Sequence, residues 1–221
     1  MATPPDNKHE TIRERNVAAI LAAAEIEFAE KGMRGASMQA VADRAGLPKA
    51  NVHYYFKSKK TLYLAVLNRT LELWNASLGE LSEDDDPREV IERFIRQKMT
   101  LARAHPRASR LFAMEVIQGA PFLKDYLRGD MREWVREKAR IFQRWIDDGR
   151  MAPVDPVYLI FLFWSATQHY ADFETQVLTI QNKAEYEDED IEAIADFLCG
   201  VIVDGCGIRS KRAGGRRAAR G

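Results

Sequence analysis

The sequence lacks the features that would place a protein outside the cell or in a membrane. It has two cysteines in 221 residues, Cys199 and Cys206, and on a helix their separation would hold them about 10 Å apart, too far for an internal disulfide. The longest apolar run, Val157–Trp164, is too short to cross a bilayer. The first ten residues lack the apolar core of a secretory signal. We therefore expect a reduced, cytoplasmic protein with two buried thiols and no membrane partner.

Signatures of catalysis are also scarce. The sequence contains no glycine-rich phosphate loop and no serine nucleophile elbow. His169 and Asp172 have the spacing of a partial metal pair, but no third ligand lies near them in the sequence. We therefore predict no cofactor, no metal and no catalytic residue, and an enzyme that acts on a small planar substrate remains an alternative.

The net charge of zero hides an uneven distribution of charge. Residues 1–60 carry ten Lys and Arg against seven Asp and Glu, and residues 209–221 carry six basic residues and no acid. Residues 61–208 therefore hold 17 basic and 26 acidic residues. Basic ends around an acidic middle suggest that the ends contact nucleic acid. For the last segment, a disordered and solvated tail is the other interpretation.

Helical periodicity runs along nearly the whole chain, whereas strand-like alternation is nearly absent. The pattern predicts an all-α protein of about nine helices, in which the first helix ends at Gly32 and two long helices cover about 127–149 and 157–177. The expected division is a flexible arm over 1–12, a helix-turn-helix DNA-binding domain of three short helices over 13–73, a helical bundle for effector binding and dimerisation over 74–208, and a disordered basic tail over 209–221. The acidic segment Asp84–Pro87 is a further boundary signal.

The most informative segment is Ser37–Phe56, SMQAVADRAGLPKANVHYYF. Ser37 is a preferred N-cap, Gly46 gives a turn its backbone freedom, and Pro48 suits the first turn of the next helix. Burial of Ala42, Ala45, Val52 and Tyr55 in the seam between the two helices leaves a polar outer face, as a DNA-reading helix pair requires. The residues expected to contact DNA are Ser37, Lys49, Ala50, Asn51, His53, Tyr54, Lys57 and Lys59.

The chemistry of these side chains matches the surface of a duplex. Lysine reaches guanine acceptors or phosphates, asparagine pairs with the edge of adenine, and the small Ala50 permits close approach to a thymine methyl. The Ser37 hydroxyl and the backbone N–H groups beside it suit a phosphate. The alternative is a pair of packed helices with a solvated face, and helix-turn-helix geometry alone does not separate the two interpretations.

The run Ile20–Leu67 resembles the TetR family of repressors, above all in AGLPKANVHYYFKSKKTLYLAVL. The shared pattern is Ala-Gly at the turn, an aromatic pair before Phe, and Lys-Ser-Lys leading into a connecting helix. The resemblance implies a homodimeric repressor that binds palindromic operator DNA and releases it when a small molecule binds. The sequence departs from the family pattern at Pro48, where many members have a Ser or Thr hydroxyl that can bind phosphate.

The C-terminal half resembles the pyrimidine-responsive branch of the same family. The segments that carry this resemblance are ASRLFAMEVIQGAP (108–121), MAPVDP (151–156) and ATQHYADF (166–173). It implies an effector such as uracil, thymine or a related catabolite, and control of nucleobase catabolism. A regulator that responds to an unrelated small molecule is the alternative within the family.

A small planar effector needs an apolar slot with a few convergent hydrogen-bonding groups. The helix expected over 157–177 presents such residues on roughly one face, and a glutamine amide matches the amide edge of a pyrimidine. The candidate effector-binding residues are Trp74, Phe112, Trp145, Phe161, Trp164, Ser165, Gln168 and Asp172. Alternatively, the aromatic residues fill the core and the polar ones bond internally. We expect His169 on a dimer surface or in the core, and Glu115 in solvent.

The last two helices are apolar on more than one face, as expected when one side meets the core and another meets a partner. The candidate dimer seam comprises Tyr158, Leu162, Tyr170, Ile194, Leu198, Val201 and Ile202. A two-fold dimer would place its recognition helices in successive major grooves, about 34–36 Å apart. Effector binding should tilt the helix that carries Leu62–Trp74 and so change this spacing. A DNA binder without sequence preference, helped by the basic tail, is a third alternative.

Overall fold

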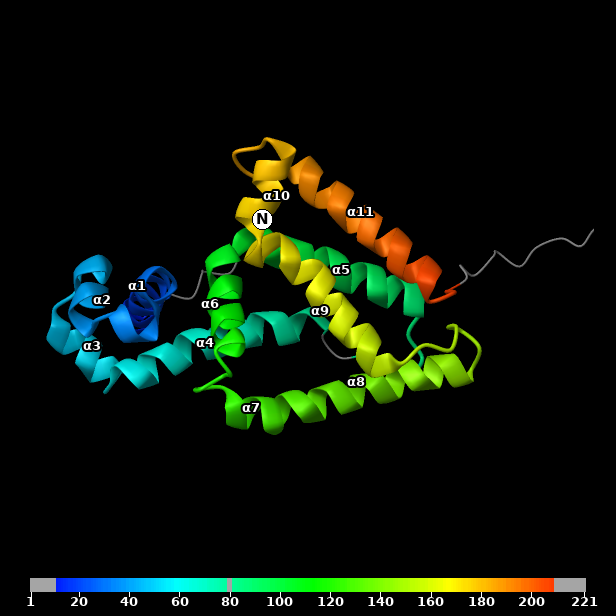
Figure 1. Ribbon diagram of the computed structural model, residues 1–221. Coiled ribbons are helices and arrows are strands. Elements are labelled where there is room, and N and C mark those ends of the chain that lie inside the picture. Colours follow the sequence, from blue (N-terminus) through cyan, green and yellow to red (C-terminus); the bar gives the residue numbers. More distant parts are fainter. Residues whose placement is uncertain (1–10, 79–80, 209–221) are drawn as a thin grey trace, which may run out of the picture.

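The computed structural model describes residues 11–78 and 81–208, in which every regular element is a helix (Figure 1). The all-α prediction is therefore confirmed for this part of the chain. The N-terminal helices are α1 (Ile12–Gly35), α2 (Met38–Ala45), α3 (Lys49–Tyr55) and α4 (Lys59–Leu78). The others are α5 (Pro87–Ala104), α6 (Pro106–Ile117), α7 (Lys124–Arg128), α8 (Asp130–Asp147), α9 (Pro156–Asp172), α10 (Glu174–Gln181) and α11 (Asp188–Gly205). The predicted tail over 209–221 and the first ten residues of the predicted arm lie outside the described residues.

The starts of several helices follow the capping signals in the sequence. The Ser37 hydroxyl accepts a hydrogen bond of 3.1 Å from the N–H three residues further on, at the start of α2. Ser58 makes the same contact, also at 3.1 Å, at the start of α4. Asp86 caps α5, whose first residue is Pro87. The acidic segment at 84–87 is thus the start of a helix.

The described chain has eleven helices instead of about nine, because both predicted long helices are interrupted. Gly129, with φ −97° and ψ −99°, separates α7 from α8. Phe173, with φ −113° and ψ 28°, separates α9 from α10. At the second interruption Arg110 donates hydrogen bonds to the Ala171 carbonyl at 3.3 Å and to the Glu174 carboxylate at 2.8 Å. A side chain from α6 thus satisfies groups at this interruption, which helical periodicity alone does not reveal.

The end of the first helix also differs from the prediction. Gly32 has φ 66° and ψ 174°, which is outside the helical region, but the helix continues after it to Gly35. The Ala36 N–H closes the end of α1 on the Gly32 carbonyl at 3.2 Å. Gly32 therefore kinks the helix and does not end it, since glycine adopts such a backbone without steric penalty.

The side chains form two hydrophobic cores. One core joins α1–α4, through residues such as Phe28, Val52 and Leu62, to Leu111 of α6. The other joins α5, α8, α9, α10 and α11 around residues such as Trp145. Figure 1 shows α1–α3 at one end and α4 running from them toward the other helices. Because α4 also contacts α5 and α6 also contacts α9, these two helices connect the two halves.

The two cysteines lie in the second core, as predicted. Cys199 and Cys206 are free thiols and are 5% and 3% exposed. Burial raises the pKa of both thiols above the usual value, which favours the unreactive protonated form. None of the helices in the described residues is both long and apolar enough to cross a membrane.

Candidate DNA-reading surface and effector cavity

Helices α2 and α3 form the helix-turn-helix around an apolar seam. Gly46 ends α2 in the left-handed conformation, with φ 66° and ψ 29°, and this conformation favours glycine. Ala42 and Val52 are fully buried, one from each helix, and both belong to the core that contains Phe28. Ala45 and Tyr55 are partly buried. The seam that the sequence predicts is therefore present, and it fixes which face of α3 points outward.

The outward face of α3 carries the side chains that were expected to read DNA. Lys49, Ala50, His53 and Tyr54 are exposed, Asn51 is partly exposed, and both Ser37 and Lys57 are exposed close by. Tyr54 is 79% exposed although its ring is large and apolar. It stacks edge-on against Tyr55, with ring centroids 5.1 Å apart. Large exposed apolar side chains of this kind are common at surfaces that bind a partner.

Lys59 differs from the other candidates. Its ammonium donates hydrogen bonds to the carbonyls of Arg34 at 3.2 Å and Ala36 at 2.8 Å. These carbonyls lie at and just after the end of α1, where they have no helical donor. Lys59 therefore ties α1 to α4, and this structural role corrects its assignment to the residues that contact DNA.

A cavity of about 380 Å³ lies between α4 and the helices of the second core. Side chains from six helices line it: Leu71, Trp74 and Asn75 from α4, Phe94 and Lys98 from α5, Phe112, Ala113, Val116 and Ile117 from α6, Leu127 from α7, Met131 and Trp134 from α8, and Trp164, Gln168 and Asp172 from α9. Its size and mainly apolar lining, with a few polar groups, are typical of a site for a small organic molecule.

Five of the eight candidate effector residues meet in this cavity, namely Trp74, Phe112, Trp164, Gln168 and Asp172. Trp74 and Phe112 pack edge to face with centroids 4.9 Å apart. On another wall Trp164 stacks on Trp134 at 6.0 Å, and Trp134 was not among the candidates. The cavity thus has aromatic walls from helices that are distant in the sequence.

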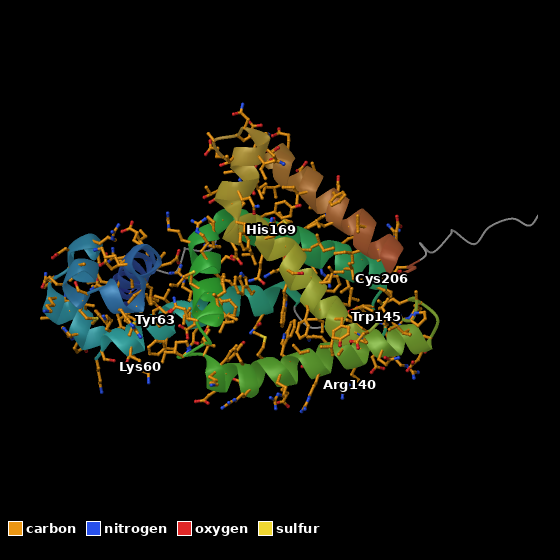
Figure 2. The ribbon with its side chains drawn as sticks, in the orientation of Figure 1. Lys60, Tyr63, Arg140, Trp145, His169 and Cys206 are labelled. Carbon is orange, nitrogen blue, oxygen red and sulfur yellow. The ribbon has the colours of Figure 1, made fainter. Side chains whose placement is uncertain are left out.

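Three candidates lie elsewhere, which corrects their assignment to the pocket. Trp145 is fully buried in the second core, where its indole N–H donates to the Glu83 carbonyl at 2.8 Å. Figure 2 labels it toward the end of the molecule far from α1–α3. Phe161 is 49% exposed, and the exposed Ser165 donates to the Leu162 carbonyl at 3.1 Å. Periodicity identified a face of α9 but not the part of that face that neighbouring helices cover.

The polar groups of the cavity include a lysine that the sequence reasoning missed. Lys98 is 4% exposed, and its ammonium lies 4.3 Å from the centroid of the Trp74 ring. Burial lowers the pKa of Lys98 to about 7, against a smaller raising effect of Asp172. The available signal was its position on the apolar face of α5, four residues after Phe94.

Asp172 is partly buried and lines the same cavity. It accepts a hydrogen bond of 2.5 Å from the Ser109 hydroxyl. Burial raises the pKa of Asp172, whereas this hydrogen bond and the charges of Lys98, Arg110 and His169 lower it. Four neighbours therefore favour the carboxylate form against the effect of burial.

Glu115 is buried, 3% exposed, although we expected it in solvent. Its carboxylate accepts a hydrogen bond of 3.0 Å from the Tyr63 hydroxyl and one of 2.6 Å from the Phe122 N–H. Burial and this carboxylate raise the pKa of Tyr63 well above its usual value. Figure 2 shows Tyr63 on the part of α4 that lies between α1–α3 and α6. The carboxylate therefore joins α6 to the helix that leads into the DNA-reading domain.

The predicted dimer seam divides between surface and core. Tyr158, Leu162 and Val201 are 70%, 48% and 56% exposed on α9 and α11. Leu198 and Ile202 are buried in the second core, which corrects their assignment to an outward seam. Tyr170 and Ile194 are partly buried against the same core. Two further aromatic residues on these helices are exposed: Phe161, which was assigned to the effector pocket, and Phe197, at 49% and 63% exposure.

His169 gives no sign of a metal site. Its ring is exposed and stacks on Phe173 with centroids 5.0 Å apart. Within residues 11–78 and 81–208, no cluster of three or more His, Cys, Asp or Glu side chains is arranged to hold a metal ion.

Comparison with known proteins accounts for nearly the whole described chain. Residues 20–66 match the model of bacterial regulatory proteins of the tetR family, and residues 67–209 match that of the C-terminal region of YcdC-like proteins. The HTH-type transcriptional regulator RutR of Escherichia coli K12 is 40% identical over 187 residues, which are 85% of this chain and 88% of RutR. The transcriptional activator FasR of Mycolicibacterium smegmatis is 42% identical over 59 residues, 27% of this chain and 26% of FasR.

Solved structures share the fold at lower identity. The putative transcriptional regulator SCO4942 of Streptomyces coelicolor has a TM-score of 0.68 at 23% identity, over 87% of this chain and 98% of its own. AibR in complex with isovaleryl coenzyme A and operator DNA has a TM-score of 0.63 at 19% identity, over 84% and 97%. The relatives and both family models are regulators, which argues against an enzyme. The chain belongs to the TetR family of helix-turn-helix transcriptional regulators.

Proposed function

We propose that this regulator is a homodimeric repressor that binds a palindromic operator and leaves it when a pyrimidine, such as uracil, thymine or a related catabolite, enters the cavity. The genes under its control would then serve nucleobase catabolism, and its DNA target implies a cytoplasmic location. The observation that carries the proposal is the position of α4. Its first half lies in the core of the DNA-reading domain, with Leu62 and Leu67 fully buried there, and its second half lines the cavity with Leu71 and Trp74.

On the DNA side, α3 enters the major groove with its exposed face. Lys49 and Asn51 read base edges or bind phosphates, and Tyr54 packs on the sugar-phosphate backbone or a thymine methyl. Ser37 and Lys57 bind phosphates on either side. Lys59 leaves this set, because its ammonium is engaged by the end of α1.

The dimer forms through the exposed apolar faces of α9 and α11. Tyr158, Leu162 and Val201 remain in the proposed seam, and Phe161 and Phe197 join it. A two-fold axis through this face pairs each helix with its copy, and the four helices together exclude water from these side chains. The two copies of α3 then face the same side of the dimer.

The cavity suits a ring of pyrimidine size. Its aromatic walls match the faces of a planar ring, and the Gln168 amide offers one donor and one acceptor to the ring edge. The likeness to RutR favours a pyrimidine over an unrelated molecule. One observation favours an unrelated effector: AibR, which has the same fold, was crystallised with isovaleryl coenzyme A.

Release of DNA requires the two sites to be coupled. A ligand in the cavity contacts α4 and α6 at once, and the Tyr63–Glu115 hydrogen bond joins the same two helices closer to the DNA-reading domain. A ligand that separates α4 from α6 tilts α4 and shifts α3 with it. A coupling free energy of about 1–3 kcal/mol weakens operator binding about 5–150-fold.

A footprint on the DNA around the protein's own gene, followed by release with nucleobases, tests the proposal. We expect a protected palindrome and its loss when uracil or thymine is added, together with a ligand-induced rise in the melting temperature. Gln168→Ala should blunt release while operator binding without ligand is unchanged. A protein that binds the palindrome but responds to no nucleobase or breakdown product would contradict the pyrimidine effector alone, and the absence of any footprint would contradict the repressor.

A further inference from the structure

Lys98 lines the cavity, and the proposed function does not yet use it. In the described part of the chain its ammonium takes part in no hydrogen bond or ion pair, and its contact is with the face of Trp74 at 4.3 Å. A buried ammonium is unfavourable unless an acceptor replaces the lost water. Since Lys98 lines the cavity, the missing acceptor belongs to whatever fills the cavity.

The carboxylate of Asp172, on the other side of the cavity from Lys98, limits the net charge that a ligand can carry. Asp172 also lines the cavity, but it lies too far from Lys98 for an ion pair, and its Oδ1 atom is occupied by the Ser109 hydroxyl. The cavity thus has a cationic donor on α5 and an anionic acceptor on α9. An anionic ligand would be repelled by Asp172, and a cationic ligand by Lys98.

We propose that Lys98 determines effector specificity by donating a hydrogen bond to a ring carbonyl oxygen, while an N–H beside that carbonyl donates to Asp172. The ligand class is a neutral, planar cyclic imide or ureide that lies against the Trp74–Phe112 wall. This inference rests on the proposed effector role of the cavity and names the contacts that select its ligand.

The assignment has a consequence for pH. The ammonium form of Lys98 donates a strong, charge-assisted hydrogen bond to a carbonyl oxygen, whereas the neutral amine donates only a weak one. Affinity for the effector is therefore full below pH 7 and falls as the pH rises above the Lys98 pKa of about 7. Asp172 is the charged group that faces Lys98 from α9, and the α4 side offers the neutral Trp74 and Asn75. On α11, Asp188 and Asp196 pair with Arg103 and Arg96 of α5.

Calorimetric titration of the full-length protein with uracil between pH 6 and 8.5 tests this inference. We expect the wild-type dissociation constant to rise about 30-fold over this range, because binding requires the proton of Lys98, whose pKa is about 7. Lys98→Met retains the apolar stem without the charge, and it should weaken uracil binding at pH 6 at least 50-fold and abolish the pH dependence. Arg93→Met removes a charge from the exposed face of the same helix and should bind uracil like the wild type.

Further measurements separate this inference from the proposed function. Lys98→Met should bind operator DNA without ligand as the wild type does, which shows that it is folded. 1,3-Dimethyluracil has no N–H for Asp172 and should bind much more weakly than uracil.

Equal uracil affinity of Lys98→Met and the wild type, or a flat wild-type pH profile, would overturn the role of Lys98 and leave the pyrimidine repressor standing. If uracil does not bind but hydantoin binds in a Lys98-dependent way, the pyrimidine effector is wrong and the role of Lys98 holds. If no cyclic imide or ureide binds the wild type, the inference is wrong.

Discussion

The DNA-reading face and the effector cavity are built in opposite ways. The first takes its side chains from one short helix and its flanks, and they protrude from a core that other residues form. The second takes its side chains from six helices, and they point inward, where ligand-contacting groups and core groups are neighbours. A side chain of the DNA face can therefore be removed without loss of fold, whereas a change near the cavity alters stability and binding together.

The largest expected effect is a difference in stability between two tryptophan variants, one in the second core and one in the wall of the cavity. Trp145→Ala removes a fully buried ring and the hydrogen bond to the Glu83 carbonyl, and should lower the free energy of unfolding by about 3–5 kcal/mol. Trp164 is only partly buried, so Trp164→Ala opens a wall of a cavity that already exists and should cost about 1–2 kcal/mol while it abolishes ligand binding. Urea unfolding and ligand thermal shifts measure the two quantities. Similar losses of stability in both variants would contradict the distinction.

The second prediction applies the same contrast to the DNA face. Tyr54→Ala should weaken operator binding by about 1–3 kcal/mol and leave the unfolding free energy within about 0.5 kcal/mol, because the ring is exposed. Lys59→Ala should do the reverse. It removes donors from the Arg34 and Ala36 carbonyls and so lowers stability by about 1–2 kcal/mol. Gel shifts and thermal unfolding of the two variants decide this. A stability loss in Tyr54→Ala would mean that the ring packs against the protein.

The features of the DNA-reading domain could be predicted from the sequence because they depend on local signals. The cap at Ser37, the turn at Gly46 and the buried seam through Val52 are local signals, each set by residues within a few positions. The outward face of α3 follows from them, because a seven-residue helix with one buried side exposes the rest. The all-helical class was equally accessible, since helical periodicity is itself local.

The residues of the cavity and of the dimer face could be predicted only in part, because they depend on packing between helices that are distant in the sequence. Periodicity found the face of α9 that holds Gln168 and Asp172, but it could not tell that Trp145 is a core residue bonded to a loop some sixty positions earlier. At the break at Phe173, Arg110 of α6 donates hydrogen bonds to groups on both sides, a contact from a distant part of the sequence. Leu198 and Val201 are both apolar positions on α11, yet one is buried and the other exposed, since only the arrangement of neighbouring helices decides which side faces solvent.

A third prediction concerns the buried lysine in the ligand-free protein. Its folded-state pKa of about 7 lies below that of an unfolded lysine, so the unfolded chain holds the proton more tightly above pH 7. Stability should therefore rise with pH above about 7, by about 1–2 kcal/mol between pH 7 and 8.5, and lose this slope below pH 7. In Lys98→Met the rise should vanish. Unfolding free energies at several pH values provide the measurement, and an identical slope in both proteins would place the titration elsewhere.

The smallest expected effect tests how the two regions communicate. Tyr63→Phe keeps the edge-on ring contacts with Phe28 at 4.9 Å and Phe122 at 5.3 Å but removes the hydroxyl that donates to Glu115. Operator binding without effector and effector binding without DNA should change little. The coupling between them should fall by about 0.5–1 kcal/mol, because the hydrogen bond fixes α4 to α6 near the DNA-reading domain, and without this pivot a ligand that separates the two helices tilts α4 less.

This coupling is obtained by measuring operator affinity with and without saturating effector in each protein. Tyr186→Phe is the matched control, since its hydroxyl donates at 3.1 Å to the Tyr170 carbonyl, away from α4. Removal of the Tyr63 hydroxyl leaves Glu115 with the Phe122 N–H as its remaining donor, so some loss of stability is expected as well. A loss of stability by itself would not change the ratio of the operator affinities measured with and without effector. If Tyr63→Phe and Tyr186→Phe retain equal coupling, the Tyr63–Glu115 contact only supports the fold, and the signal passes from cavity to DNA through the apolar contacts of α4 alone.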